Sequence, residues 1–172
     1  MESKDKKGEI IFKMVLLAVA AIYFVSRAAD REGYHFFDNV DLVIHEAGHV
    51  LISPFGEFLG MAGGTILQLA VPLVFAAYFF VRDERLSAGF VMFWLGQSFI
   101  NVARYAGDAI VMELPLIGGG IHDWNYLLSA TGLLRQTVFI SDIFYYTGVG
   151  IIISAIIIGV IALAKEKQAD GL

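Results

Sequence analysis

Apolar stretches of membrane-spanning length constrain the fold of this chain more than any other feature. A spanning helix needs about 20 mostly apolar residues, and three uncharged segments meet or approach that length: residues 61–81, 86–103 and 143–164. A fourth, residues 10–26, contains a single lysine, and a fifth, residues 40–59, is long enough although it carries several ionisable side chains. The sequence therefore predicts an all-α, polytopic membrane helix bundle. We expect about five spans, at residues 10–28, 39–59, 61–81, 86–107 and 143–164.

Composition supports this class and excludes others. Hydrophobic residues make up 58% of the 172 positions, against 45–50% in soluble domains, and five spans leave no room for a soluble domain. The net charge of -5 provides no basic surface for nucleic acid. Because there is no cysteine, any metal must be held by histidine and carboxylate ligands. We expect residues 1–172 to form one integral, multi-pass domain in the lipid bilayer of a prokaryotic cell (inner) membrane.

The connection before the last span is unusually long. Residues 108–142 contain Pro115, three consecutive glycines at 118–120, and an apolar patch at residues 127–134 that is too short to span. We expect this segment to re-enter the membrane or to lie along its interface. Trp124 and Tyr126 would then lie at headgroup level.

The most informative motif is H-E-x-x-H at residues 45–49, inside the polar fifth segment. Residues four apart share one face of a helix, so the imidazoles of His45 and His49 can bind one ion. Glu46 projects about 100° away, within reach of a metal-bound water without being a ligand. Ionisable side chains are costly in a membrane helix and mark functional sites. The motif predicts a zinc site with Glu46 as the base, which needs a third protein ligand and one open position.

Two neighbours of the motif are open to interpretation. Asp41 lies one turn before His45, where it either orients that imidazole or complements the helix dipole. Pro54 removes a backbone hydrogen bond and should kink or end the helix just past His49. Because freed backbone in a membrane is tolerated where protein or water covers it, we expect a wet pocket there.

Polar residues on two other spans are expected to face this site. Gln68 and Pro72 interrupt the third span, and the fourth carries a single polar stripe formed by Gln97, Asn101, Arg104 and Asp108. Candidates for the third metal ligand are Asp108 and His122, followed by Asp123. Arg104 offers Asp108 an ion pair instead.

The chain resembles the site-2 protease family of intramembrane zinc metalloproteases. The resemblance rests on H-E-x-x-H within a hydrophobic segment followed by a polar span, and it covers residues 40–108. That family has a second motif, roughly N-x-x-P followed by L-D-G, which supplies an aspartate ligand. The nearest match here is Asn101 to Ala109, with Arg104 in place of the proline and Ala109 in place of the glycine.

The resemblance implies hydrolysis of a peptide bond in a membrane-embedded substrate. Glu46 would deprotonate the zinc-bound water, and the metal with Asn101 or Gln68 would stabilise the oxyanion. Residues 60–65, rich in glycine, would pair with the unwound substrate as an added strand. The sequence leaves three alternatives open: a zinc hydrolase of lipid-linked or small amphiphilic substrates, a metal transporter, and a catalytically silent protein that binds helices.

Overall fold

The computed structural model describes residues 2–116 and 120–171, and helices are its only regular elements there. They are α1 (Glu2–Ala29), α2 (Phe36–Ile52), α3 (Glu57–Val81), α4 (Arg85–Gly107), α5 (Asp123–Ala130) and α6 (Thr137–Ala169), with short 3-10 turns at Ser53–Phe55 and Leu134–Gln136. The predicted all-α helical bundle is confirmed. Gly118 and Gly119 of the predicted loop lie outside the described residues.

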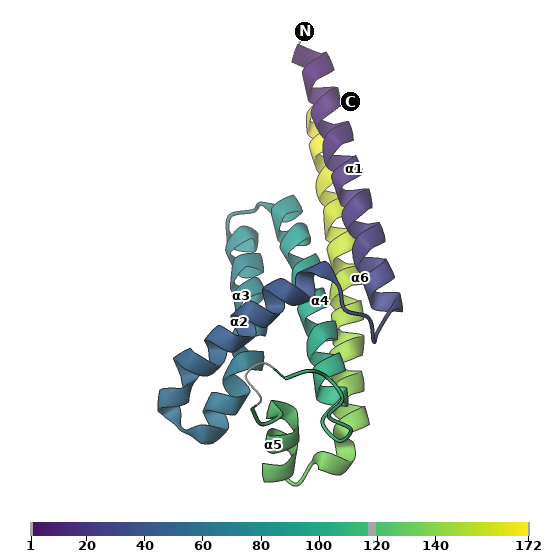
Figure 1. The fold of residues 1–172 in the computed structure, drawn as a ribbon. Coiled ribbons are helices and arrows are strands. Elements are labelled where there is room, and N and C mark those ends of the chain that lie inside the picture. Colours follow the sequence, from purple (N-terminus) through teal and green to yellow (C-terminus); the bar gives the residue numbers. More distant parts are fainter. Residues whose placement is uncertain (1, 117–119, 172) are drawn as a thin grey trace.

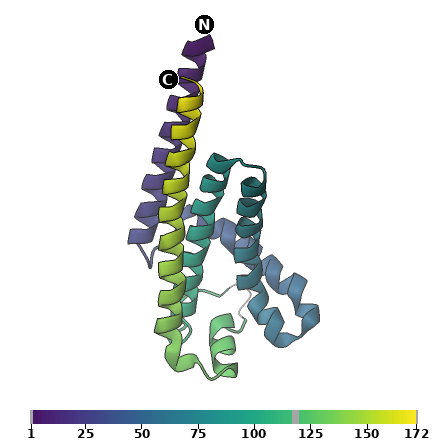
Figure 2. The same cartoon turned by 180° about the vertical axis from the view of Figure 1, so that it is seen from behind.

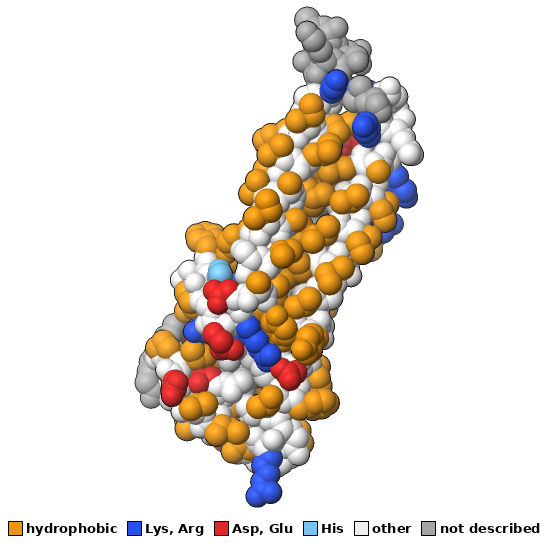
Figure 3. All heavy atoms as spheres, turned by 90° about the vertical axis from the view of Figure 1, so that its right-hand side faces the viewer, with side chains coloured by type: hydrophobic (Ala, Val, Ile, Leu, Met, Phe, Trp, Pro, Cys, Tyr) orange, Lys and Arg blue, Asp and Glu red, His pale blue; other side chains and the backbone are white. Residues whose placement is uncertain are grey.

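Four of these helices are long and apolar enough to cross a membrane: Lys6–Ala29, Glu57–Val81, Arg85–Gly107 and the segment Leu134–Ala169. Their outer surfaces are apolar as well. Hydrophobic side chains cover the face formed by α1 and α6 (Figure 3). Both helices have exposed apolar residues, such as Phe12, Ile22 and Ile157. Exposed apolar side chains over whole helices suit contact with lipid. The chain thus has the make-up of a membrane protein.

Helix α2 is the exception to the predicted spans. It has 17 residues and ends at Ile52, seven residues before the predicted boundary at 59. Pro54 lies in the 3-10 turn that follows, as expected for a residue that lacks an N–H and cannot continue a helix. In Figure 1, α2 lies obliquely across α3 and α4. The segment that carries the H-E-x-x-H motif is thus a short, tilted helix.

The other long helices pack side by side. α1 and α6 run next to each other and extend well past the α3–α4 hairpin (Figures 1 and 2). Lys6 pairs with Asp170 at 2.9 Å, and Lys13 with Glu166 at 2.5 Å, near the ends of this pair. α4 packs along both α6 and α3, and α2 along α3. α4 therefore forms the centre of the bundle, and α2 and α5 each contact both α3 and α4.

Helix α2 buries polar residues and exposes apolar ones. Its buried residues are Asp38, Asp41, His45 and Gly48, which follow one stripe toward α3 and α4. Val43 and Val50, on other faces, are 71% and 74% exposed. Membrane helices place ionisable groups toward the bundle interior or a cavity. The bundle therefore accommodates the ionisable side chains of α2 on its buried stripe, while the apolar side chains of α2 occupy its exposed faces.

Helix α3 corrects two expectations. It continues through Pro72, so that residue and Gln68 do not interrupt it. Pro72 is buried, and prolines within membrane helices are tolerated where neighbouring protein covers the freed backbone groups. Residues 60–65 are also helical. They are therefore in no position to offer a free strand edge to a substrate.

The connection before α6 folds back onto the bundle. Its apolar patch overlaps the second half of helix α5, in which Leu127 and Leu128 are buried. Trp124 is also buried, with its ring 5.4 Å from that of Phe144 in an edge-to-face arrangement. Its ring packs beside α4 and α6, so Trp124 is part of the protein core, and its placement at headgroup level stays a prediction.

Candidate metal centre

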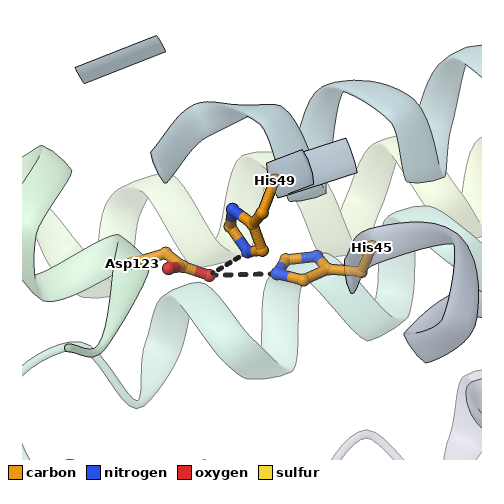
Figure 4. Close-up of side chains that lie close together, drawn as sticks. All are labelled: His45, His49 and Asp123. Carbon is orange, nitrogen blue, oxygen red and sulfur yellow. Dashed lines mark hydrogen bonds and ion pairs between the residues drawn. The ribbon is translucent and has the colours of Figure 1, made fainter. Parts of the chain in front are cut away.

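Three potential ligands converge where α2 meets α5. The Nε2 atoms of His45 and His49 lie 3.0 and 3.1 Å from Oδ2 of Asp123 (Figure 4). Together they form the group of His, Asp and Glu side chains, among the described residues, whose ligand atoms lie within 4.8 Å of one another. The one-turn spacing in the motif brings the imidazoles together, and the fold adds a carboxylate 74 residues beyond His49.

Helix α5 positions that carboxylate. Asp123 is its first residue, and His122 caps the helix by accepting the N–H of Asn125 at 3.2 Å. Tyr105 of α4 holds Asp123 from the other side. Its hydroxyl donates to Oδ2 at 3.2 Å and accepts the backbone N–H of Asp123 at 3.3 Å. Burial favours a raised pKa for Asp123, but in the metal-free protein hydrogen bonds donated by protonated Nε2 atoms of His45 and His49 outweigh it and hold the pKa well below its ordinary value.

A hydrogen-bond chain fixes the tautomer of His45. Asp38 can only accept, so Asn101 directs its Nδ2 to Oδ1 of Asp38, at 2.9 Å. The oxygen of Asn101 then accepts from Nε2 of Gln68 at 2.8 Å. The remaining amide oxygen, Oε1 of Gln68, lies 3.1 Å from Nδ1 of His45, which must carry the proton. This relay, formed by Asp38, Asn101 and Gln68, leaves Nε2 of His45 directed at Asp123.

A single hydrogen bond orients His49 so that its Nε2, like that of His45, faces Asp123. Its Nδ1 lies 2.8 Å from the backbone carbonyl of Gly60 in α3. Because a carbonyl oxygen only accepts, Nδ1 carries the proton and Nε2 is left to face Asp123. Such outer contacts fix the tautomer and orientation of metal-binding histidines in proteins.

This donor set could hold a metal ion. Two imidazole Nε2 atoms and one carboxylate oxygen direct their lone pairs at a common centre. These lone pairs repel one another unless protons or a cation lie between them. Ligand atoms around a tetrahedral zinc, with bonds of about 2.0–2.1 Å, are about 3.3 Å apart. The distances of 3.0 and 3.1 Å from the imidazoles to Asp123 require little expansion to reach that spacing. His45, His49 and Asp123 would hold the metal.

Glycines bring α2 and α3 into contact at this site. A Cβ on Gly48 would lie 2.9 Å from Cα of Gly64 and 2.7 Å from the carbonyl carbon of Gly63. A Cβ on Gly64 would lie 2.5 Å from Nε2 of His45 and 2.6 Å from two ring carbons. Small residues allow helix backbones to approach closely. These glycines therefore pack the helices and make room for an imidazole, a role different from the predicted substrate strand.

Glu46 lies where two cavities meet. One, of about 370 Å³, is lined by Glu46, His49, Tyr105 and Asp123 among others. The other, of about 450 Å³, is lined by Glu46 together with His45, Gln68, Asn101 and Arg104. Among the described residues, no hydrogen bond or ion pair engages the carboxylate of Glu46. Its placement beside the imidazoles but outside the ligand group agrees with the role of a base.

Asp108 and His122, the other predicted ligands, form a separate pair. Nε2 of His122 lies 3.3 Å from Oδ2 of Asp108. The two oxygens of Asp108 accept the backbone N–H groups of Glu113 and Leu114, each at 3.0 Å. Asp108 therefore organises the loop after α4, while His122 caps α5. The structure brings neither residue into the cluster with His45 and His49.

Asp41 has neither of the two roles considered for it. Its Oδ1 accepts hydrogen bonds from Nε1 of Trp94 and from the hydroxyl of Ser98, both at 2.9 Å, and its side chain is fully buried. Asp41 thus ties α2 to α4 one turn before the first histidine. This link helps to fix the position of the motif within the bundle.

Sequence reasoning missed Tyr105, and it ranked Asp123 behind Asp108 and His122 as the third metal ligand. Tyr105 lies one helical turn after Asn101, so the polar stripe on α4 offered a signal for it. No comparable periodicity points to Asp123, because it lies beyond the end of α4, at the start of another helix. Comparison with known proteins returns no matching family model, curated protein or solved structure.

Proposed function

We propose that the protein is a zinc-dependent intramembrane endopeptidase, which hydrolyses a peptide bond of a membrane-embedded substrate. The observation that carries the proposal is the convergence of His45, His49 and Asp123 beside Glu46. Two imidazoles and one carboxylate are the ligand set of many catalytic zinc sites in hydrolases, which keep one position open. The cavity of about 370 Å³ provides that open side.

Each residue of the cluster has a defined task in this proposal. When bound, zinc supplies a Lewis acid, which lowers the pKa of a water ligand to about 7. Glu46 takes the proton from the attacking water and delivers it to the leaving amine. Gln68 and Asn101 hold His45 in its binding tautomer, since their amides already bond to each other and to Asp38. This positioning task replaces the oxyanion contact that the family resemblance implied for them.

The surroundings favour a substrate that arrives through the lipid. α2 exposes apolar side chains around a buried polar stripe, and four other helices have spanning length. The two cavities at Glu46 share Glu46, Tyr105 and Leu116 in their walls. A substrate lying along both cavities would pass Glu46 near the middle of its bound segment.

The test compares the wild type with Glu46→Gln, purified in detergent and loaded with zinc. Single-pass model peptides serve as probes, and mass spectrometry detects their products. We expect Glu46→Gln to retain zinc and helix content but to lose turnover by at least about 100-fold, as for loss of a general base. Glu32→Gln is the matched control, because Glu32 is exposed in the connection between α1 and α2. Full activity of Glu46→Gln would refute the assignment.

Other outcomes would point to the alternatives. Zinc flux across protein-containing vesicles that persists in Glu46→Gln would identify a transporter. Wild-type cleavage of lipid-linked but not peptide probes would identify a different hydrolase. Binding of the helical peptides without any product, in zinc-loaded wild type, would favour a helix-binding protein.

A further inference from the structure

Arg104 lies on the wall of the larger cavity with spare hydrogen-bonding capacity. It belongs to the last turn of α4 and helps to line the cavity of about 450 Å³. Within residues 2–116 and 120–171, no hydrogen bond or ion pair involves its guanidinium group, and its Nε is buried without a partner. The ring of Tyr34 lies beside it, with its centroid 5.9 Å from Cζ. Arg104 is partly buried, and a cation withdrawn from water in a membrane bundle ordinarily has an anionic partner.

The acids around Arg104 are engaged elsewhere. Asp38 lines the same cavity, but its Oδ2 accepts the backbone N–H of His35 at 2.6 Å, and its Oδ1 accepts from Asn101 and Gln97. Its charge also faces Arg27, with Nη2 of that side chain 3.9 Å from Oδ1. Among the described residues, no carboxylate therefore forms an ion pair with the guanidinium of Arg104 at 4.0 Å or less.

Asp108, the acid that sequence spacing suggested as a partner for Arg104, is also unavailable. Both of its oxygens accept backbone N–H groups of the loop after α4. Glu46 shares the cavity wall with Arg104, yet within the described chain the two form no ion pair at 4.0 Å or less. Its position beside the imidazoles also ties Glu46 to the metal centre.

The cavity itself has the character of a site for an amphiphilic group. Apolar side chains line part of it, including Leu42, Leu114 and Leu116. It shares Glu46 and Tyr105 with the smaller cavity at the metal centre. A ligand that occupies both cavities would extend an apolar segment past Glu46 and place its next polar group beside Arg104.

We propose that Arg104 binds an anionic oxygen group, a carboxylate or a phosphate, of the molecule that occupies this cavity. Guanidinium is suited to this task because its fork of N–H donors matches the oxygens of both groups. That this molecule is a substrate rests on the proposed function. A substrate bound in this way would carry an acidic group close to the scissile bond. The anion site itself needs neither zinc nor Glu46.

Binding of small amphiphiles to the zinc-free, full-length protein in neutral detergent tests the proposal. The probes are N-dodecanoylglycine and its amide, and dodecyl phosphate and its neutral methyl diester, with affinity measured by calorimetry. We expect the wild type to bind at least one anionic probe about tenfold or more tightly than its neutral counterpart, as for hydrogen bonds to a charged group. Preference for the carboxylate would indicate an acidic peptide, and preference for the phosphate a lipid headgroup.

Variants locate the site. Arg104→Gln should abolish the preference for the anion, and Arg104→Lys should retain part of it. Arg82→Gln is the matched control, because it removes one positive charge from an exposed position in the α3–α4 hairpin and should leave the preference intact. Equal wild-type affinity for anionic and neutral probes would overturn the proposal without any variant, and so would an unchanged preference in Arg104→Gln. Because zinc is absent, failure here is distinct from failure of the metal centre.

Discussion

Replacement of Gly64 by alanine should remove the metal site while it leaves the bundle folded. The added Cβ would lie 2.5 Å from Nε2 of His45, whereas an ordinary contact begins at about 3.4 Å, so the ring must move by about 0.9 Å. Ligand positions in metal sites are held to about 0.2 Å. The atoms in conflict belong to a side chain, which can swing away, so the backbone packing need not change. We expect zinc affinity to fall by at least about 100-fold, or about 3 kcal/mol.

The assay is competition for zinc with a chromophoric chelator, combined with circular dichroism and thermal unfolding. Gly150→Ala is the matched control, because its Cβ would meet nothing within 4 Å on the exposed side of α6. It should keep zinc affinity and gain about 0.5–1 kcal/mol of helix stability. Gly48→Ala should instead destabilise the fold, since its Cβ would meet the backbone of α3. Wild-type zinc affinity in a folded Gly64→Ala protein would refute the described position of the His45 ring.

Two further predictions use the same zinc titration. Asp123→Asn should abolish tight zinc binding, because it removes the anionic ligand, whereas Asp108→Asn should retain it, because Asp108 bonds to the loop backbone; the reverse result would restore Asp108 as the third ligand. Gln68→Met, of similar size, deprives Nδ1 of His45 of its acceptor and should weaken zinc binding about 10–100-fold. Unchanged affinity in a folded Gln68→Met protein would show that the relay does not orient the imidazole.

The relay explains why so many polar groups lie inside this bundle. Asp38, Asn101 and Gln68 come from three different helices, and each satisfies the next. A buried polar group without a partner is costly in a membrane, so a chain of mutual donors and acceptors is the economical arrangement. It begins at Asp38, which Arg27 faces, and ends at His45. The same contacts thus hold α2 against the bundle and orient its first histidine.

Much of the architecture could be predicted from local sequence. Helices form at all five predicted segments, because apolar runs in a membrane have no other way to satisfy their backbone. Their boundaries differ where packing intervenes: α6 begins at Thr137 and not at 143, and α2 ends at Ile52. The pairing of His45 with His49 was predictable as well, since it follows from helical periodicity. These features depend on residues close together in the chain.

Hydrophobicity and the repeat of the α-helix therefore determined the class of fold, the two histidines on one face and the neighbouring Glu46. Only the tertiary structure decided that Asp123 faces them, that Gln68 orients His45, and that Gly64 makes room for its ring. Those contacts join α2 to α3 and α5, across 19 to 78 residues of chain. Local periodicity carries no information over such separations, because the packing of whole helices decides which side chains meet.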